Sequence, residues 1–72
     1  MNRSIYVIYA PLKKGFFVSI DIVDDVISCV YDPDFTKARI FADKTFVDGF
    51  VVDLDDQLPD TKHHVLTVKC KL

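Results

Sequence analysis

The sequence contains no glutamate and no tryptophan, and only two cysteines and two glycines occur among its 72 residues. The absence of glutamate excludes an EF-hand calcium loop, which needs a bidentate glutamate at its twelfth position. No Cys-x₂-Cys or His-x₃-His spacing occurs, so no zinc site is predicted. No run approaches the ~18 apolar residues of a membrane span. Because nucleophile–base and oxyanion motifs are also missing, we expect neither an enzyme nor a cofactor.

All eleven acidic residues are aspartates, and they are unevenly distributed along the chain. Ten lie in residues 21–56 with only three basic residues, which gives this window a formal charge of 3 − 10 = −7. Residues 1–20 carry three basic residues and no acidic residue, and the whole chain sums to −2. Charge distributions of this kind act on partner choice and association rate more than on fold. The acidic middle favours a basic partner and argues against direct binding of nucleic acid.

The length predicts a single domain over residues 1–72 with one small core. A chain of this size buries only about 60 % of its unfolded surface, so apolar surface is left over that self-association would cover. Cys29 and Cys70 each lie within an apolar strand pattern. We expect both to be reduced core thiols, which together with the lack of a membrane span predicts a cytoplasmic location.

Alternating apolar residues predict an antiparallel sheet in the first half of the chain. Residues 5–10 are apolar on both faces, as is typical of a central strand. Residues 15–23 and 26–31 read as a hairpin with Asp24 and Asp25 at its tip. The core-facing set of its first strand is expected to be Phe16, Val18, Ile20 and Ile22.

The period changes to helical after Asp43, which is a good N-cap residue. Apolar residues at Phe46, Val47, Phe50, Val51, Leu54 and Leu58 form one stripe, and Pro59 ends it. The competing interpretation of residues 43–58 is a hairpin turning at Asp48-Gly49, since Asp-Gly is a strong turn signal. Residues 38–41 are expected to form an edge strand or extended piece, and residues 63–72 a closing strand. The predicted fold is α+β in the order β-β-β-β-α-β, with four or five antiparallel strands and one helix packed on one sheet face.

Seven residues are candidates for contact with a partner. On the predicted helix, Asp48, Val52 and Asp56 lie opposite the apolar stripe, and Asp53 and Asp55 flank its two edges. Asp24 and Asp25 complete the set at the hairpin tip. The alternative is that these aspartates only keep the domain solvated.

Residues His63 and His64 are adjacent, so in a strand they point to opposite faces and cannot bind one metal ion together. Cys29 and Cys70 likewise look like core residues, which argues against a Cys-His catalytic pair.

Parts of the sequence resemble small proteins encoded by phages and prophages. The similar segments are Ile5-Tyr6-Val7-Ile8-Tyr9, Gly15-Phe16-Phe17-Val18 and residues 32–41 with the following Asp43-Lys44. The helix departs from that group, having Asp, Val and Gly where Glu, Lys and Ala are usual. Some members act as host-takeover proteins or anti-CRISPR inhibitors, so the resemblance implies a non-enzymatic binder.

The function expected is therefore a phage-borne binding protein that inhibits or redirects a host complex in the host cytoplasm. Its partner is expected to be a host protein or ribonucleoprotein with a basic surface. The alternative is an assembly protein that forms a homodimer through a sheet edge or face.

Overall fold

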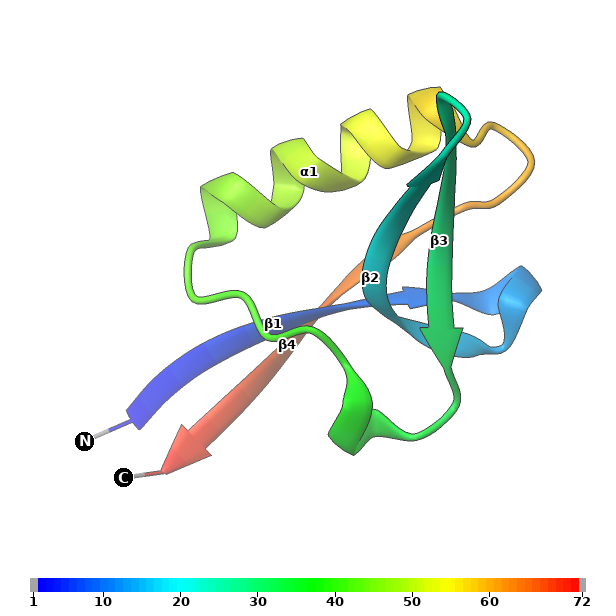
Figure 1. The fold of residues 1–72 in the computed structure, drawn as a ribbon. Helices are drawn as coiled ribbons and strands as arrows, with labels where there is room; N and C mark the ends of the chain where they lie inside the picture. Colours follow the sequence, from blue (N-terminus) through cyan, green and yellow to red (C-terminus); the bar gives the residue numbers. More distant parts are fainter. Residues whose placement is uncertain (1, 72) are drawn as a thin grey trace.

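The computed structural model of the chain describes residues 2–71 and confirms a small α+β fold. Its elements are β1 (Asn2–Ala10), β2 (Gly15–Val23), β3 (Val26–Asp32), α1 (Lys44–Gln57) and β4 (His64–Lys71) (Figure 1). Two short 3-10 turns, Pro11–Lys13 and Phe35–Lys37, lie in the connections. Within residues 2–71 no helix combines the length and the apolar character needed to cross a membrane.

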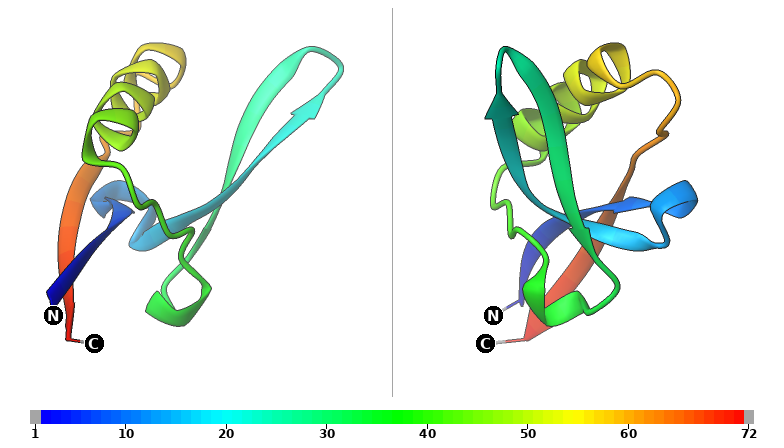
Figure 2. Two further views of the ribbon diagram at one scale, coloured as in Figure 1. Left: turned by 90° about the vertical axis from the view of Figure 1, so that its left-hand side faces the viewer. Right: turned by 45° about the vertical axis from the view of Figure 1, so that its right-hand side comes forward.

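The four strands form one antiparallel sheet in the order β3-β2-β1-β4. β1 pairs with β4 from Asn2 to Tyr9, and β2 pairs with β3 from Phe16 to Val23 with one shift in register. Between β1 and β2, pairing is confined to Tyr9 with Phe16 and Ala10 with Gly15. The sheet therefore consists of two ribbons joined at one corner, and the β2–β3 hairpin swings away from α1 (Figure 2).

The segment of residues 38–41 fills the space where β1 and β2 separate. The Arg39 amide donates to the Phe17 carbonyl at 2.9 Å, while Phe41 and Tyr6 exchange two backbone hydrogen bonds of 2.8 Å. The prediction of an extended piece is confirmed here, but its placement at an edge is wrong, and only Phe41 pairs as an isolated bridge. Residues 38–41 form hydrogen bonds with the backbones of the two diverging strands, but they do not add a strand to the sheet. The order of elements is therefore β-β-β-α-β.

The core lies between α1 and the β1–β4 ribbon. It consists of Ile8, Phe17, Phe41, Val47, Val51 and Leu54. Val7 and Ile8 point to opposite faces of β1 and are both fully buried. The prediction that the first strand is central is therefore confirmed.

The predicted core face of β2 is wrong. Phe17 is buried, whereas Ile20 and Ile22 are exposed. The ladder shifts between Phe17 and Ser19, so Val18 is an extra residue of the kind that forms a β-bulge. Beyond the bulge, Ile20 and Ile22 share a face with Phe17, but the hairpin there extends past the cover of α1.

The helix prediction is confirmed over the hairpin alternative. The Asp43 carboxylate accepts a hydrogen bond from the Phe46 amide at 3.2 Å and so caps the first turn. At the other end, the Leu58 amide donates to the Leu54 carbonyl before Pro59. Tertiary burial of Val47, Val51 and Leu54 outweighs the weak helix propensity of this segment.

Cys29 and Cys70 are free thiols and only partly buried. Cys29 packs against the core, whereas the expectation of a core position is wrong for Cys70. They lie on β3 and β4, which are opposite edges of the sheet. The strand order therefore holds the two thiols apart.

Candidate functional site

The outward side of α1 carries Asp48, Val52 and Asp56, which we call the acidic helix face. Four-residue spacing aligns the three side chains along one side of the helix. All three are exposed, and Val52 keeps 66 % of its surface accessible. The sequence thus predicted correctly an apolar side chain between two carboxylates.

One of these carboxylates already has a partner within the helix. Lys44 Nζ lies 2.7 Å from Asp48 Oδ2 across one helical turn. The hydrogen bond and the charge of Asp48 raise the pKa of the lysine. Because both side chains are largely exposed, this pair is easily exchanged for another partner. Asp56 has no ion pair among the described residues.

Asp53 and Asp55 lie on opposite flanks of α1, as predicted, but their surroundings differ. Asp53 is exposed beside a shallow concavity formed with Phe46, Gly49 and Phe50. Asp55 instead accepts two hydrogen bonds from His63, one from the backbone amide at 3.1 Å and one from Nδ1 at 2.7 Å. Asp55 therefore holds the loop that follows the helix and is a poor candidate for partner contact.

Asp24 and Asp25 form the tip of the β2–β3 hairpin, where the sequence placed them. Both have left-handed backbone angles, with φ of 52° and 64°. A two-residue hairpin turn of type I′ requires this conformation, and aspartate tolerates it better than most residues. The hairpin tip and α1 lie on two separate arms of the molecule (Figure 2).

A buried polar chain that the sequence analysis missed joins three elements. His63 is buried, and its Nε2 lies 2.6 Å from the Tyr31 hydroxyl while Nδ1 lies 2.7 Å from Asp55 Oδ1. The Asp55 carboxylate accepts the hydrogen bond from Nδ1, while the direction of the hydrogen bond between Nε2 and the Tyr31 hydroxyl depends on the tautomer. The tyrosine ring also stacks on the imidazole at a centroid distance of 5.8 Å.

Cys29 extends this chain through Tyr31. Burial raises the pKa of the Cys29 thiol, and burial together with the cysteine raises the pKa of Tyr31. A raised thiol pKa disfavours the thiolate that a nucleophile needs. Tyr31 also stands between Cys29 and His63, so the arrangement suits structural anchoring of β3 to the end of α1. Across residues 2–71, no three His, Cys or Asp side chains gather as a metal site would require.

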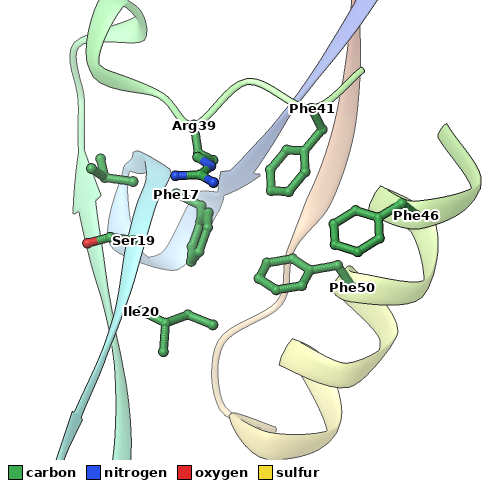
Figure 3. A pocket seen from close by; sticks show the side chains of 8 residues that line it. Phe17, Ser19, Ile20, Arg39, Phe41, Phe46 and Phe50 are labelled. Carbon is green, nitrogen blue, oxygen red and sulfur yellow. The ribbon is translucent and has the colours of Figure 1, made fainter. Parts of the chain in front are cut away.

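A second missed feature is an apolar hollow between α1 and the β2–β3 hairpin, which we call the helix–hairpin groove. Its volume is about 340 Å³, and its aromatic part comes from Phe17, Phe41, Phe46 and Phe50 (Figure 3). Phe50 lies at its centre, with ring centroids 5.4 Å from Phe17 and 5.5 Å from Phe41. Ile20 lines the hairpin side, and Arg39 lines the groove from the segment of residues 38–41.

Phe46 is the exposed wall of the helix–hairpin groove. Its ring stacks on Phe50 at 16° and 6.0 Å, yet 60 % of the residue surface is accessible. The sequence placed Phe46 in the core stripe because its spacing is helical. Its position at the edge of that stripe, beside the open groove, could not be read from the spacing.

Comparison of the chain with protein-family models, with curated proteins and with solved structures finds no match in any of the three.

Proposed function

We propose that the chain is a non-enzymatic protein-binding domain that docks on a basic surface of a partner. The observation that carries the proposal is the acidic helix face, where an exposed Val52 lies between the exposed carboxylates Asp48 and Asp56. Apolar area supplies affinity when it is buried, and surrounding charges supply specificity and association rate.

The position of these charges on the helix also supports the proposal. Asp53, Asp55 and Asp56 lie in the C-terminal half of α1, where negative charge opposes the helix dipole. Each such carboxylate costs a few tenths of a kcal/mol at an exposed site. Asp55 recovers this cost through His63, but Asp53 and Asp56 have no ion pair among the described residues. Residues kept at a cost in stability are expected to serve another role.

A finer form of the proposal concerns the partner. A phage-borne inhibitor would occupy the basic surface of a host protein or ribonucleoprotein complex in the host cytoplasm. The resemblance to phage and prophage proteins supports this form, and the −7 charge of residues 21–56 agrees with a basic target.

Affinity capture tests the proposal with a matched pair of variants. Tagged wild-type protein is incubated with lysate of the cells in which it acts, beside Asp48→Asn/Asp56→Asn. The control is Leu12→Lys/Asp60→Asn, which changes the net charge by the same amount at exposed sites outside the helix. We expect one stoichiometric partner that the control retains and the acidic-face variant loses. Equal retention by both variants would refute this surface.

The second candidate is a homodimer formed through the edge of β3. This strand ends the sheet, and its Val26 and Val30 are exposed. Unpaired strand edges with apolar side chains are templates for pairing with another chain. Sedimentation velocity at rising protein concentration distinguishes the candidates, because only the second predicts a dimer in the absence of a partner.

A further inference from the structure

The molecule exposes more surface than a compact protein of its mass. Its accessible surface is 5188 Å², whereas a compact monomer of this mass exposes about 4,500 Å². Its radius of gyration is 12.6 Å, against about 11 Å expected for a compact chain of this length. The excess is on the order of 650 Å², close to the roughly 800 Å² that one partner contributes to a stable interface. The open angle between α1 and the β2–β3 hairpin contributes to this extended shape, together with the projecting end of the β1–β4 ribbon (Figure 2).

The helix–hairpin groove lies within that open angle and is apolar on both sides. Phe46 and Phe50 form the wall on α1, and Ile20 forms the wall on β2 (Figure 3). Ile22 continues the face of Ile20 toward the hairpin tip and is 67 % exposed. Large side chains on two facing elements, open to solvent, form a surface that buries an apolar partner.

The charged residues around the open end of the groove are acidic. Asp24 and Asp25 lie at the hairpin tip, and Asp53 lies on the helix next to Phe46 and Phe50. All three carboxylates are exposed, and none has an ion pair among the described residues. Arg39, on the segment of residues 38–41, is the basic residue that lines the groove, and it lies near Phe17 and Phe41. The open end therefore complements a positively charged partner.

We propose that the helix–hairpin groove binds a basic amphipathic helix of the partner protein. An amphipathic helix places apolar anchors at i, i+3, i+4 and i+7 into a groove while its flanks stay polar. Lysine or arginine on those flanks pairs with Asp24, Asp25 and Asp53. This inference rests on the proposed function, since it names the part of a basic partner that the domain grips.

A second copy of the chain is a poorer occupant. It would bring its own acidic arms toward Asp24, Asp25 and Asp53, and juxtaposed like charges disfavour association. An added strand would pair with the outer edge of β3 and leave the groove unfilled, because the groove walls are side chains and not free backbone.

The test uses a synthetic 14-residue peptide of leucine and lysine, blocked at both ends, with leucines at i, i+3, i+4 and i+7. A peptide of the same composition in shuffled order has no apolar face and serves as the control probe. Each is titrated into ¹⁵N-labelled full-length protein while amide shifts are followed. The protein is also diluted alone, so that self-association is seen in the same experiment.

Two variants truncate one exposed apolar side chain on each side of the groove, and each has a matched control outside the groove. Phe46→Ser on α1 is compared with Leu12→Ser, whose exposure of 69 % is close to the 60 % of Phe46 and which lies outside both the groove and the acidic helix face. Ile22→Ser on β2 is compared with Val23→Ser. Val23 is the next residue, its side chain points to the opposite face of the strand, and its exposure is 64 %. All four sites are exposed, so the fold tolerates each change, and the amide spectrum of each variant verifies this.

We expect the amphipathic peptide to shift amides of residues 17–22, 39–41 and 46–50. Phe46→Ser and Ile22→Ser should each weaken binding by about tenfold, as loss of a buried side chain does, while the two matched controls change it by less than about twofold. The shuffled peptide should bind more weakly than the amphipathic one.

Several outcomes overturn the groove assignment. Shifts confined to the acidic helix face, or equal binding of both peptides, would leave the proposed function standing without the groove. Groove shifts that appear on concentrating the protein alone would make a second copy the occupant. Absence of binding refutes the groove, while the affinity capture with Asp48→Asn/Asp56→Asn judges the proposed function independently.

Discussion

At the scale of single residues, His63 joins parts of the chain that are distant in sequence. Its ring is hydrogen-bonded through Nε2 to the Tyr31 hydroxyl of β3 at 2.6 Å and through Nδ1 to the Asp55 carboxylate of α1 at 2.7 Å. A buried imidazole with both nitrogens satisfied adds specificity, because any other placement leaves a polar atom unpaired. The loop before β4 is thereby held against the end of the helix.

Removing the tyrosine hydroxyl tests this connection. Tyr31→Phe leaves Nε2 of the buried His63 without its partner, and we expect a loss of about 1–3 kcal/mol in the free energy of unfolding. Urea unfolding measures it, with Tyr9→Phe as the control because Tyr9 makes no such bond to a buried histidine. Equal stabilities of the two variants would contradict the role given to His63.

The same tyrosine predicts a dependence of stability on alkaline pH. Burial raises the pKa of Tyr31 above its ordinary value of 10.0. The folded state then holds the proton more tightly than the unfolded state, so this stabilisation is full below pH 10 and is lost as pH rises further. Thermal melts between about pH 8 and pH 11 should show a steeper decline for wild type than for Tyr31→Phe. Parallel declines would show that Tyr31 does not contribute.

At the scale of elements, the sequence was most informative where a structure depends on nearby residues. The Asp43 cap, the stop at Pro59 and the Asp24-Asp25 turn all depend on residues within a few positions, and all were predicted. The shifted ladder at Val18 was not, because a bulge is chosen by the packing of Phe17 against residues far along the chain. The helix–hairpin groove depends on that shift, so the sequence could not reveal it.

The helix cap gives a direct test at this scale. Asp43→Ala removes the acceptor for the Phe46 amide and should destabilise the fold by about 1 kcal/mol. Asp56→Ala is the control, since it removes a charge of the same kind from the last turn, where loss of negative charge is neutral or slightly favourable. Chemical denaturation followed by circular dichroism measures both. A larger loss for Asp56→Ala would contradict the assignment of the cap.

Substitution by alanine should have opposite effects on the stability of the fold at the two glycines. A Cβ at Gly49 meets nothing within 4 Å, so Gly49→Ala should stabilise α1 by about 0.5–1 kcal/mol. A Cβ at Gly15 lies 3.1 Å from the Asp32 backbone, so Gly15→Ala should destabilise the corner where the two ribbons meet. Melting temperatures of both variants check the prediction. Destabilisation by Gly49→Ala would indicate that the outer side of α1 is packed in solution.

At the scale of the whole molecule, two arms extend from one small core. The core fixes α1 on the β1–β4 ribbon, while the β2–β3 hairpin projects with apolar side chains on both faces. Both arms carry exposed aspartates, which explains why the acidic window of the sequence spans hairpin and helix. The sequence predicted the exposure of Asp24, Asp25, Asp48, Asp53 and Asp56, but not the half-buried position of Asp55. It also did not reveal that these residues lie on separate arms, because the separation follows from the splitting of the sheet.

The central claim is that charge and apolar area on these arms together bind a basic partner. The most direct test is the Kd of the captured partner at about 50 and 300 mM salt, since exposed charges are screened over this range. We predict that wild-type binding weakens as salt rises, and that Asp48→Asn/Asp56→Asn is about tenfold weaker at low salt and less sensitive to salt. A Kd that neither salt nor this variant changes would contradict the account.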